Sequence, residues 1–537
     1  MKKAALILLS LVMLFSLVAC GGKPAEPANT GTPGSATSDP TPNNGPSSNE
    51  TSAPVGRETL SVAMTTDYGT LDAIGVSQNY FDVLVNVMEP LWDYGLDGTI
   101  RYRLAESAEF VEPDHMVVTL KKGVTFSNGN PFTASDVLFS MTLYRDAGTP
   151  YAPQKVQTTD FERTKIIDDY SFDWYLKSPT ILQYTCAASM YIYDEESYDP
   201  EKQALNPIGT GPYVVTEYVV NSHTVIERRD DYWGELPQLK TITFHIIKET
   251  AQQMNSLETG LVDVTPISLA DVEYAKNLPG VQVRARKGGY IYLGLNIAQD
   301  CKLADPLARE AICHAIDTQA ISNVIYYGLA REMHNPFTTA VMDMEDRFEN
   351  LGVYEKGYDL ELAQKMAEEA GLVGETLVLA NNGQAEFITA SEMIQDMLAK
   401  IGVTVEIVSF DNASYIEVKN DKTKFDLNLS SGSVVNYVLG DYFVNGVAYN
   451  KVNGDAENWA NGHGQRYQEI MRGSLNELDD AKRSDILYEL MGYYIETNPT
   501  YGLVEFDTYY AFPDDLDFDQ YFDTIMAPYF AWDFNFK

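Results

Sequence analysis

The stretch F-S-N-G-N-P-F-T-A-S-D-V-L-F-S, residues 126–140, combines a turn with the start of a helix. Asn128-Gly129 favours a tight turn, because these residue types tolerate backbone angles that most others avoid. Thr133 or Ser135 is suited to cap the helix, since its hydroxyl can accept a hydrogen bond from a free N–H of the first turn. The buried face of this helix is then predicted to carry Val137, Leu138 and Met141. We therefore expect the stretch to shape the fold rather than to bind a ligand.

Candidate strands and helices are mixed on both sides of this stretch, along residues 57–537. Strand-like patterns occur at 59–64, 108–111, 115–120, 241–247 and 403–408. Helical patterns occur at 305–316, 358–370 and 391–400. The first of these helices opens with Asp305-Pro306, a capping residue followed by a proline in the first turn. A body of about 480 residues is too long for one core. The pattern therefore predicts an α/β protein of two or three domains.

Motifs that carry chemistry are missing from the sequence. It contains no G-x-S-x-G, H-E-x-x-H or G-x-x-x-x-G-K-[ST] pattern, and its six histidines form no i, i+4 pair. Cys186, Cys301 and Cys313 have no C-x-x-C spacing, so a metal site is not indicated, and a bridge between the last two stays open beside free thiols. The net charge of −39 argues against a nucleic-acid partner. An enzyme is the weaker class, and we expect no cofactor and no metal.

Residues 126–140 resemble the signature of family 5 solute-binding proteins, the oligopeptide, dipeptide and nickel receptors of ABC importers. Further resemblances follow in the order of the family, beginning with Leu71-Asp72, where Ala73 replaces a proline. The others are I-G-T-G-P-Y at 208–213, R-D-D-Y-W at 229–233, the helix end at 257–263, Y-L-G-L-N at 292–296, and the segments 309–317 and 358–372. Each match is modest alone, and together they cover nearly the whole body.

The resemblance implies a two-lobed, type II periplasmic-binding-protein-like α/β fold with a hinge between the lobes and an inserted third subdomain. We expect lobe I at 57–100, 206–285 and 498–537, the inserted subdomain at 101–205, and lobe II at 286–497. It further implies a monomer that captures a peptide-like or other small solute between the lobes and delivers it to the permease subunits of an ABC transporter. A ligand sensor for a membrane signalling partner is an alternative with the same fold.

The first 20 residues have the order of a secretory signal, with Lys2-Lys3 before an apolar run that is too short to span a bilayer. Leu17-Val18-Ala19-Cys20 resembles the lipobox of bacterial lipoproteins, which implies lipidation of Cys20. An ordinary secretory signal is the alternative. Residues 21–56 are rich in Pro, Gly, Ser, Thr and Asn and predict a disordered tether. We therefore expect the protein at the outer face of the bacterial cell membrane, or in the periplasm, held by a lipid anchor.

Two loops depart from the family. Peptide-binding members hold the α-ammonium with an aspartate in a loop that corresponds to 430–437, and dipeptide members add an arginine in a segment that corresponds to 380–386. Neither segment carries the expected charge here. An unpaired buried ammonium or carboxylate costs several kcal/mol, so simple dipeptides with free termini are expected to bind poorly unless other residues substitute.

These loops offer neutral polar groups instead. The predicted ligand-binding residues are Asn381, Asn382, Gln384, Ser433, Asn436 and Tyr437 in lobe II, with Asn79 and Tyr80, beside Gln78, in lobe I. Such side chains suit a neutral oligosaccharide, or a modified or longer peptide held by its backbone. The alternative is that the amides only cap turns, which asparagine often does.

Overall fold

A four-stranded sheet contains the first strand of the described residues. The computed structural model describes residues 57–67, 69–74, 81–94, 99–149, 152–188, 190–341, 343–419, 421, 423–433, 438–445, 463–517 and 535–536, which belong to one compact unit of the chain. The sheet has the order β1-β10-β9-β8, with β1 parallel to β10 and the other pairs antiparallel. Its strands are β1 (Thr59–Met64), β10 (Thr241–Ile246), β9 (His223–Arg228) and β8 (Tyr213–Val219), beside the helices α1 (Phe81–Val87) and α4 (Pro200–Gln203). The predicted strands at 59–64 and 241–247 are confirmed.

Two glycines let a turn approach the end of α1 closely. Gly211 donates its N–H to the carbonyl oxygen of Val87 at 2.9 Å. A Cβ atom on Gly211 would lie 2.6 Å from the carbonyl oxygen of Asn86, and one on Gly209 would lie 2.1 Å from that of Val87. Only glycine fits at such distances, which explains the I-G-T-G-P-Y sequence physically.

A second four-stranded sheet, β4-β5-β7-β6, belongs to the segment predicted as an insertion. Its hairpin of β4 (Ala105–Glu112) and β5 (His115–Leu120) turns at Pro113-Asp114, as predicted. The other elements of this segment are β7 (Ser171–Tyr175), β6 (Lys165–Asp168), η1 (Ala152–Val156), α2 (Ala134–Asp146) and α3 (Leu182–Ala187). A short pair of strands, β2 (Trp92–Tyr94) and β3 (Ile100–Tyr102), lies at the predicted start of the insertion, with β2 ahead of residue 101.

The quoted turn and helix form as the sequence predicts. Gly129 has a φ of 91°, in the region that favours glycine. Thr133 is the N-cap residue of α2, and its N–H donates to the Asp136 carboxylate at 2.8 Å. Val137 and Met141 are fully buried, and Leu138 is half-buried. This stretch therefore has a structural role in the fold.

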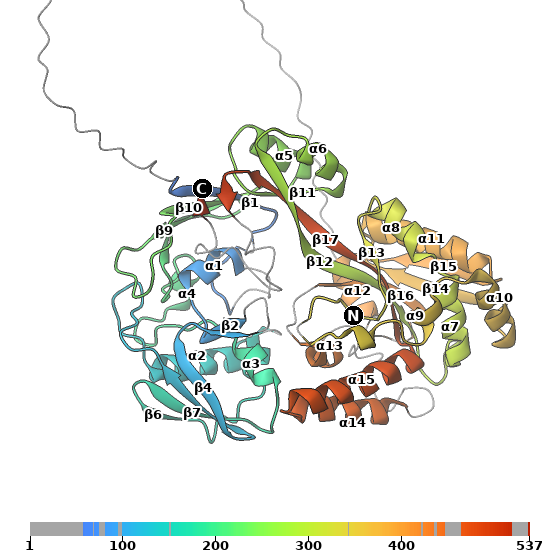
Figure 1. Ribbon diagram of the computed structural model, residues 1–537, viewed down its shortest axis with the longest axis horizontal. Coiled ribbons are helices and arrows are strands. Elements are labelled where there is room, and N and C mark those ends of the chain that lie inside the picture. The colour runs from blue at the N-terminus through green and yellow to red at the C-terminus, as the bar shows by residue number, and fades with distance from the viewer. Residues whose placement is uncertain are drawn as a thin grey trace, which may run out of the picture. The chain divides into compact units, whose positions relative to one another are not determined.

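A seven-stranded sheet forms the rest of the body, in the order β11-β17-β12-β16-β14-β15 with β13 attached to β17. Its two longest strands, β12 (Val281–Leu295) and β17 (Thr500–Pro513), run antiparallel side by side over almost their whole length (Figure 1). The remaining strands are β11 (Thr265–Ile267), β16 (Leu427–Ser433), β14 (Thr376–Asn381), β15 (Thr404–Ser409) and β13 (Arg331–Glu332). A separate two-stranded pair joins β18 (Leu516–Asp517) and β19 (Asn535–Phe536).

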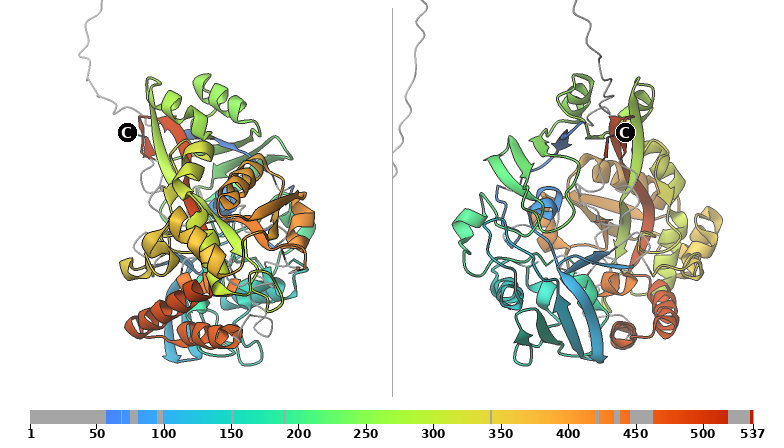
Figure 2. Two further views of the ribbon diagram at one scale, coloured as in Figure 1. Left: turned by 90° about the vertical axis from the view of Figure 1, so that its right-hand side faces the viewer. Right: turned by 60° about the vertical axis from the view of Figure 1, so that its left-hand side comes forward.

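Helices flank this sheet, and α14 and α15 pack against each other (Figure 2). The predicted helices at 305–316, 358–370 and 391–400 correspond to α7, α10 and the second part of α11, and their existence is confirmed. The helices are α5 (Thr250–Glu258), η2 (Leu269–Asp271), α6 (Val272–Lys276), α7 (Pro306–Ala315), α8 (Thr318–Ile325), η3 (Asp346–Phe348), α9 (Val353–Lys356), α10 (Leu360–Glu369), α11 (Ala385–Ala399), α12 (Asn412–Val418), α13 (Leu439–Asn445), α14 (His463–Asn476) and α15 (Asp480–Thr497).

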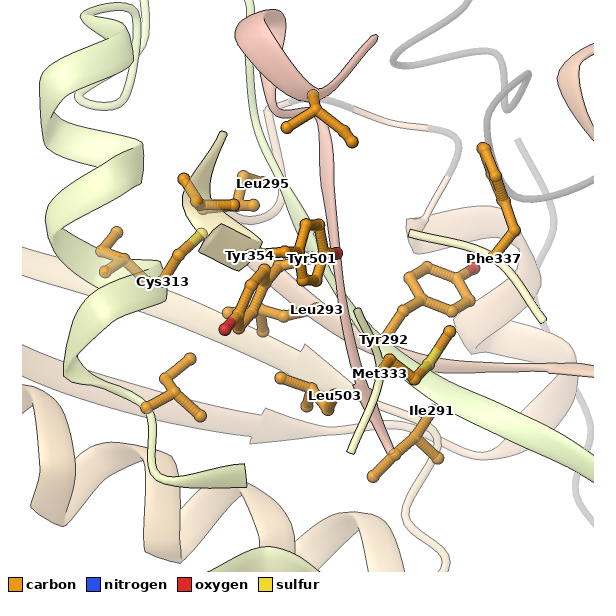
Figure 3. Packing of buried hydrophobic residues seen from close by; sticks show 14 of the residues in the cluster. Ile291, Tyr292, Leu293, Leu295, Cys313, Met333, Phe337, Tyr354, Tyr501 and Leu503 are labelled. Carbon is orange, nitrogen blue, oxygen red and sulfur yellow. The ribbon is translucent and has the colours of Figure 1, made fainter. Parts of the chain in front are cut away.

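The two long strands contribute to more than one hydrophobic core. Their adjoining parts, including Leu293 and Leu503, lie in the core beneath α7 to α15, where Tyr354 and Tyr501 stack with ring centroids 5.0 Å apart (Figure 3). Near the other end of β17, Ala511 belongs to the core around α5 and α6. Its neighbour Phe512 belongs to the core around the first two sheets. The predicted boundary between residues 285 and 286 falls inside β12, and the division into lobes stays a prediction.

The cysteines of the described residues are free thiols. Cys186 and Cys313 are buried and Cys301 is half-buried, without a bridge between the last two. Cys313 accepts a hydrogen bond from the Asn498 side chain at 3.0 Å. This contact ties α7 to the residue that follows α15.

Candidate ligand-binding site

The predicted ligand loops of lobe II follow two parallel strands of the seven-stranded sheet. β14 ends at Asn381 and β16 ends at Ser433, and because the two strands run parallel, both loops leave the same edge of the sheet. Ser433 pairs with Gly289 of β12 at this edge. The fold thus brings the two predicted loops toward one edge of the seven-stranded sheet.

Asn381 is fully buried and uses both ends of its amide within the protein. Its Nδ2 donates to Ser391 Oγ at 3.0 Å, and its Oδ1 accepts from the Gly383 N–H at 2.9 Å. Ser391 Oγ in turn donates to the Phe387 carbonyl oxygen at 2.7 Å. These hydrogen bonds attach the loop to α11, so Asn381 positions the loop and its amide is not free to bind a ligand.

Asn382 and Gln384 form a more accessible pair above it. Asn382 Nδ2 donates to Gln384 Oε1 at 3.1 Å, and Asn382 Oδ1 accepts from the Gln384 N–H at 3.2 Å. Asn382 is half-buried, and Gln384, the N-cap residue of α11, is exposed. Both side chains can exchange this mutual hydrogen bond for one to a ligand.

Other predicted residues lie outside the part that the structure describes. These are Cys20, Gln78, Asn79, Tyr80, Asn436 and Tyr437, while Ser433 is described by its strand alone. Their roles stay predictions.

Glu505 is a buried carboxylate near the same edge that the sequence did not single out. It lies on β17 opposite Tyr290 of β12. Its carboxylate accepts hydrogen bonds from the Thr338 hydroxyl and from the Thr339 N–H and hydroxyl, the last two at 3.2 and 3.1 Å, and it pairs with Arg331 at 3.4 Å. Because this carboxylate is well satisfied, its role is to hold the segment around residue 338 on the sheet.

Asp343 is a half-buried residue with a less completely paired carboxylate. Its Oδ1 accepts from the Leu439 N–H at 2.5 Å, at the start of α13 and just after the predicted loop 430–437. Its Oδ2 is buried, and no hydrogen bond to it is present in the structure as described. Burial raises the pKa of Asp343 to about 6. No local motif marks this residue among 77 acidic ones, so reasoning from the sequence missed it.

An open cavity of about 370 Å³ lies at the opposite edge of the sheet, where β14 and β16 begin. Its wall includes the ion pair between Lys302 and Asp426, whose Nζ and Oδ2 atoms are 3.7 Å apart. Asp426 Oδ2 also accepts from the Val378 N–H at 2.9 Å, which ties it to the strand. This cavity is therefore separate from the predicted ligand loops.

Two negative observations apply to the described residues alone. Among them, no helix has both the length and the apolar character needed to cross a bilayer. The same residues contain no cluster of three or more His, Cys, Asp or Glu side chains that is arranged to hold a metal ion.

Residues 99–455 match the model of the bacterial extracellular solute-binding proteins, family 5, middle part. The chain belongs to this family. The dipeptide-binding protein of Escherichia coli K12 is 28% identical over 339 residues, which are 56% of this chain and 62% of that protein. The nickel-binding periplasmic protein of the same organism is 26% identical over 366 residues, 62% of this chain and 68% of that protein. The match to the dipeptide-binding relative thus spans less than two thirds of its length.

Solved structures agree on the fold of this family 5 member. The ABC transporter substrate binding protein CtaP from Listeria monocytogenes superimposes with a TM-score of 0.74 at 20% identity, covering 86% of this chain and 95% of that one. The predicted α/β, type II periplasmic-binding-protein fold is confirmed. The family consists of binding proteins, in agreement with the prediction that the chain is not an enzyme.

Proposed function

We propose that the chain is the substrate-binding protein of an ABC importer, which captures a peptide-like solute between two lobes and delivers it to permease subunits in the membrane. The observation that carries the proposal is the family match over residues 99–455. The relative named a dipeptide-binding protein supports the peptide-like solute. A ligand held between two lobes favours the closed arrangement by touching both sides.

The long strands supply a physical basis for such a hinge. The ladder between β12 and β17 shifts register between Lys287 and Gly289, and again between Ile291 and Tyr292. Such irregularities bend strands locally and increase their twist. Gly288 and Gly289 occupy the first shift, between the mostly half-buried first half of β12 and its fully buried second half. We expect closure to bend the strands at this point.

Lipid anchoring of Cys20 completes the proposal. One acyl chain gives marginal membrane binding, whereas two or more chains give a stable anchor. The tether predicted at 21–56 would let the receptor close on its solute away from the membrane and dock afterwards on the permease. The proposed location is the outer face of the cell membrane, or the periplasm, with the protein acting as a monomer.

A neutral oligosaccharide is the second candidate solute. The accessible amides of Asn382 and Gln384 favour it, because an amide both donates and accepts hydrogen bonds and so matches a sugar hydroxyl. The sensor alternative uses the same ligand site and differs only in the membrane partner.

Thermal melting against pooled ligands tests the proposal. A ligand at 100 times its Kd stabilises the protein by about 2.7 kcal/mol, which is visible as a shift in Tm. We expect a shift with a pool of peptides, compaction in small-angle scattering with the peptide that binds, and recovery of that peptide with its mass unchanged. A shift with neutral oligosaccharides alone would favour the second candidate. Steady turnover of the bound compound would refute the binding function.

A further inference from the structure

The helix α3 has two apolar faces, although it is only six residues long. Leu182 and Cys186, four residues apart, lie on one face, and Tyr184 and Ala187, three residues apart, lie on another. The first pair belongs to the hydrophobic core beneath α7 to α15. In the second pair, Ala187 belongs to the core around the first two sheets and Tyr184 packs against it. α3 therefore joins two cores of the protein.

Polar contacts attach α3 to the side of the first two sheets. The Trp92 Nε1–H group donates to the Tyr184 carbonyl oxygen at 2.9 Å, and the two aromatic rings lie with their centroids 5.7 Å apart. The Gln183 side chain is fully buried and accepts a hydrogen bond from the Thr158 hydroxyl at 2.6 Å. We therefore expect α3 to move together with these sheets when the lobes move.

The opposite side of the contact is formed by α13 and α14, which belong to the predicted lobe II (Figure 1). The N–H of Ile181, directly before α3, donates to the Leu475 carbonyl oxygen in the last turn of α14 at 3.0 Å. The last carbonyl groups of a helix have no partner within it, so this bond satisfies one of them. Ile181 Cδ1 also lies 4.0 Å from the place that a Cβ atom would take on Gly440, so its side chain reaches α13.

This contact between the predicted insertion and the predicted lobe II is small. It consists of one face of a six-residue helix, one backbone hydrogen bond and the side chain of Val438, which packs against both cores. Domains that share a small interface move relative to one another as a rule. The ladder of β12 and β17, in contrast, is continuous through the proposed hinge. The α3 contact can therefore open while the strands stay paired.

We propose that α3 is a latch, which binds α13 and α14 when the lobes close and so populates the closed arrangement before a solute arrives. This inference rests on the two-lobed mechanism proposed above and adds a means of regulating it. All atoms of the latch belong to the chain itself, so burial of Leu182 and Cys186 favours closure whether or not a solute is bound.

The latch affects how tightly a solute binds. A ligand that needs the closed arrangement has an apparent Kd equal to its intrinsic Kd divided by the fraction of protein that is closed. A latch that raises this fraction therefore tightens binding without touching the solute. The residues of α3 would then set the affinity for every solute of this protein in the same proportion.

The thiol of Cys186 reports whether the latch is open. It is buried in the contact, whereas Cys313 is fully buried in α7 and becomes accessible only when lobe II unfolds. The unliganded full chain is alkylated with iodoacetamide at about pH 8, where thiols are partly ionised, and the rate is mapped to each cysteine by mass spectrometry. We expect Cys186 of the natural protein to react faster than Cys313.

The decisive variant is Leu182→Ala, with Leu205→Ala as its matched control, because Leu205 is 58% exposed. Leu182→Ala should raise the alkylation rate of Cys186 at least about tenfold, since most of a buried leucine side chain is lost from the contact. The rate of Cys313 should stay unchanged, and Leu205→Ala should change neither rate. In small-angle scattering, unliganded Leu182→Ala should have a larger radius of gyration than the control.

The remaining outcomes each decide the proposal. If Cys313 also reacts faster in Leu182→Ala, that variant has lost its fold, and the half-buried Ile181→Ala, which keeps the backbone hydrogen bond, takes its place with a smaller expected increase. An unchanged rate at Cys186, or a faster rate with an unchanged radius of gyration, overturns the latch. Compaction of the natural protein with a bound peptide would still support the proposed function in that case. Absence of compaction with every solute would count against the proposed function, whatever the alkylation rates are.

Discussion

Replacing Arg309 by methionine is expected to lower the free energy of unfolding by about 2–6 kcal/mol, because two buried carbonyl groups would each lose their hydrogen-bond donor. The guanidinium lies in α7 and is 2% exposed. Its Nε and Nη2 donate to the Thr497 carbonyl oxygen at 3.0 and 2.7 Å, and its Nη1 donates to those of Leu303 and Ala304 at 2.5 and 3.0 Å. A single side chain, that of Arg309, therefore satisfies carbonyl groups at the end of α15 and in the loop before α7.

The magnitude follows from the carbonyl groups that would be left behind. A buried acceptor without a partner costs about 1–3 kcal/mol. The Thr497 and Leu303 carbonyl groups are buried at these contacts, whereas the contact with Ala304 is partly buried and water can replace it. Thr497 also ends α15, where a positive charge opposes the negative end of the helix dipole. Burial lowers the pKa of Arg309 to about 10, so the side chain remains charged at neutral pH.

Urea unfolding of the unliganded protein, followed by circular dichroism, measures this loss. Tryptophan fluorescence is less suitable, because Trp92, Trp174 and Trp233 all pack in the core of the first two sheets. Hydrogen exchange of α15 locates the effect. Arg472→Met is the control, since Arg472 is exposed on α14 and should change stability by no more than about 0.5 kcal/mol. A loss below about 1 kcal/mol for Arg309→Met would refute the assigned role.

Three further outcomes are expected. Gly211→Ala should lose about 1–3 kcal/mol in thermal melts, because the new Cβ would collide with the end of α1, whereas Gly148→Ala has open space and serves as its control. Unliganded Asp343→Asn should be more stable than the natural protein at pH 7.5, by at most about 3 kcal/mol. This difference in stability should vanish as the pH falls from 6 toward 4, because a carboxyl group with a raised pKa costs stability only when it must ionise. Cys20→Ala should release the protein into the medium or leave an uncleaved precursor in cell fractionation, and membrane-bound mature protein would contradict the lipid anchor.

Local signals in the sequence predict helices well here, because capping chemistry acts within a few residues. Asp305, for example, accepts the Leu307 N–H at 2.9 Å, as its position before Pro306 indicates. β12 is harder to recognise, since its first half is largely exposed or half-buried and its second half fully buried, so no single period describes it. Its pairing with β17 depends on residues that begin only at Thr500, far along the chain from the end of β12 at Leu295.

The candidate site shows the same limit. An asparagine after a strand indicates either a ligand contact or a turn cap, and only the position of Ser391, ten residues later, shows that the Asn381 amide faces inward. Asp343 carries no sequence signal, because its distinction comes from burial and from a backbone N–H that is 96 residues away in the chain. Electrostatic environment of this kind depends on the complete fold.

The position of β17 in the chain affects how the protein is made. β12 is synthesised long before β17, and all of residues 296–499 must follow before its partner exists. Until then, one edge of β12 has no partner and the cores lack Leu503, Ala511 and Phe512. Pairings between distant segments form slowly, because the loop between them must first be closed. A growing chain therefore remains incompletely folded until β17 emerges. Such a delay suits the extracytoplasmic location proposed above, because an exported chain crosses the membrane before it folds.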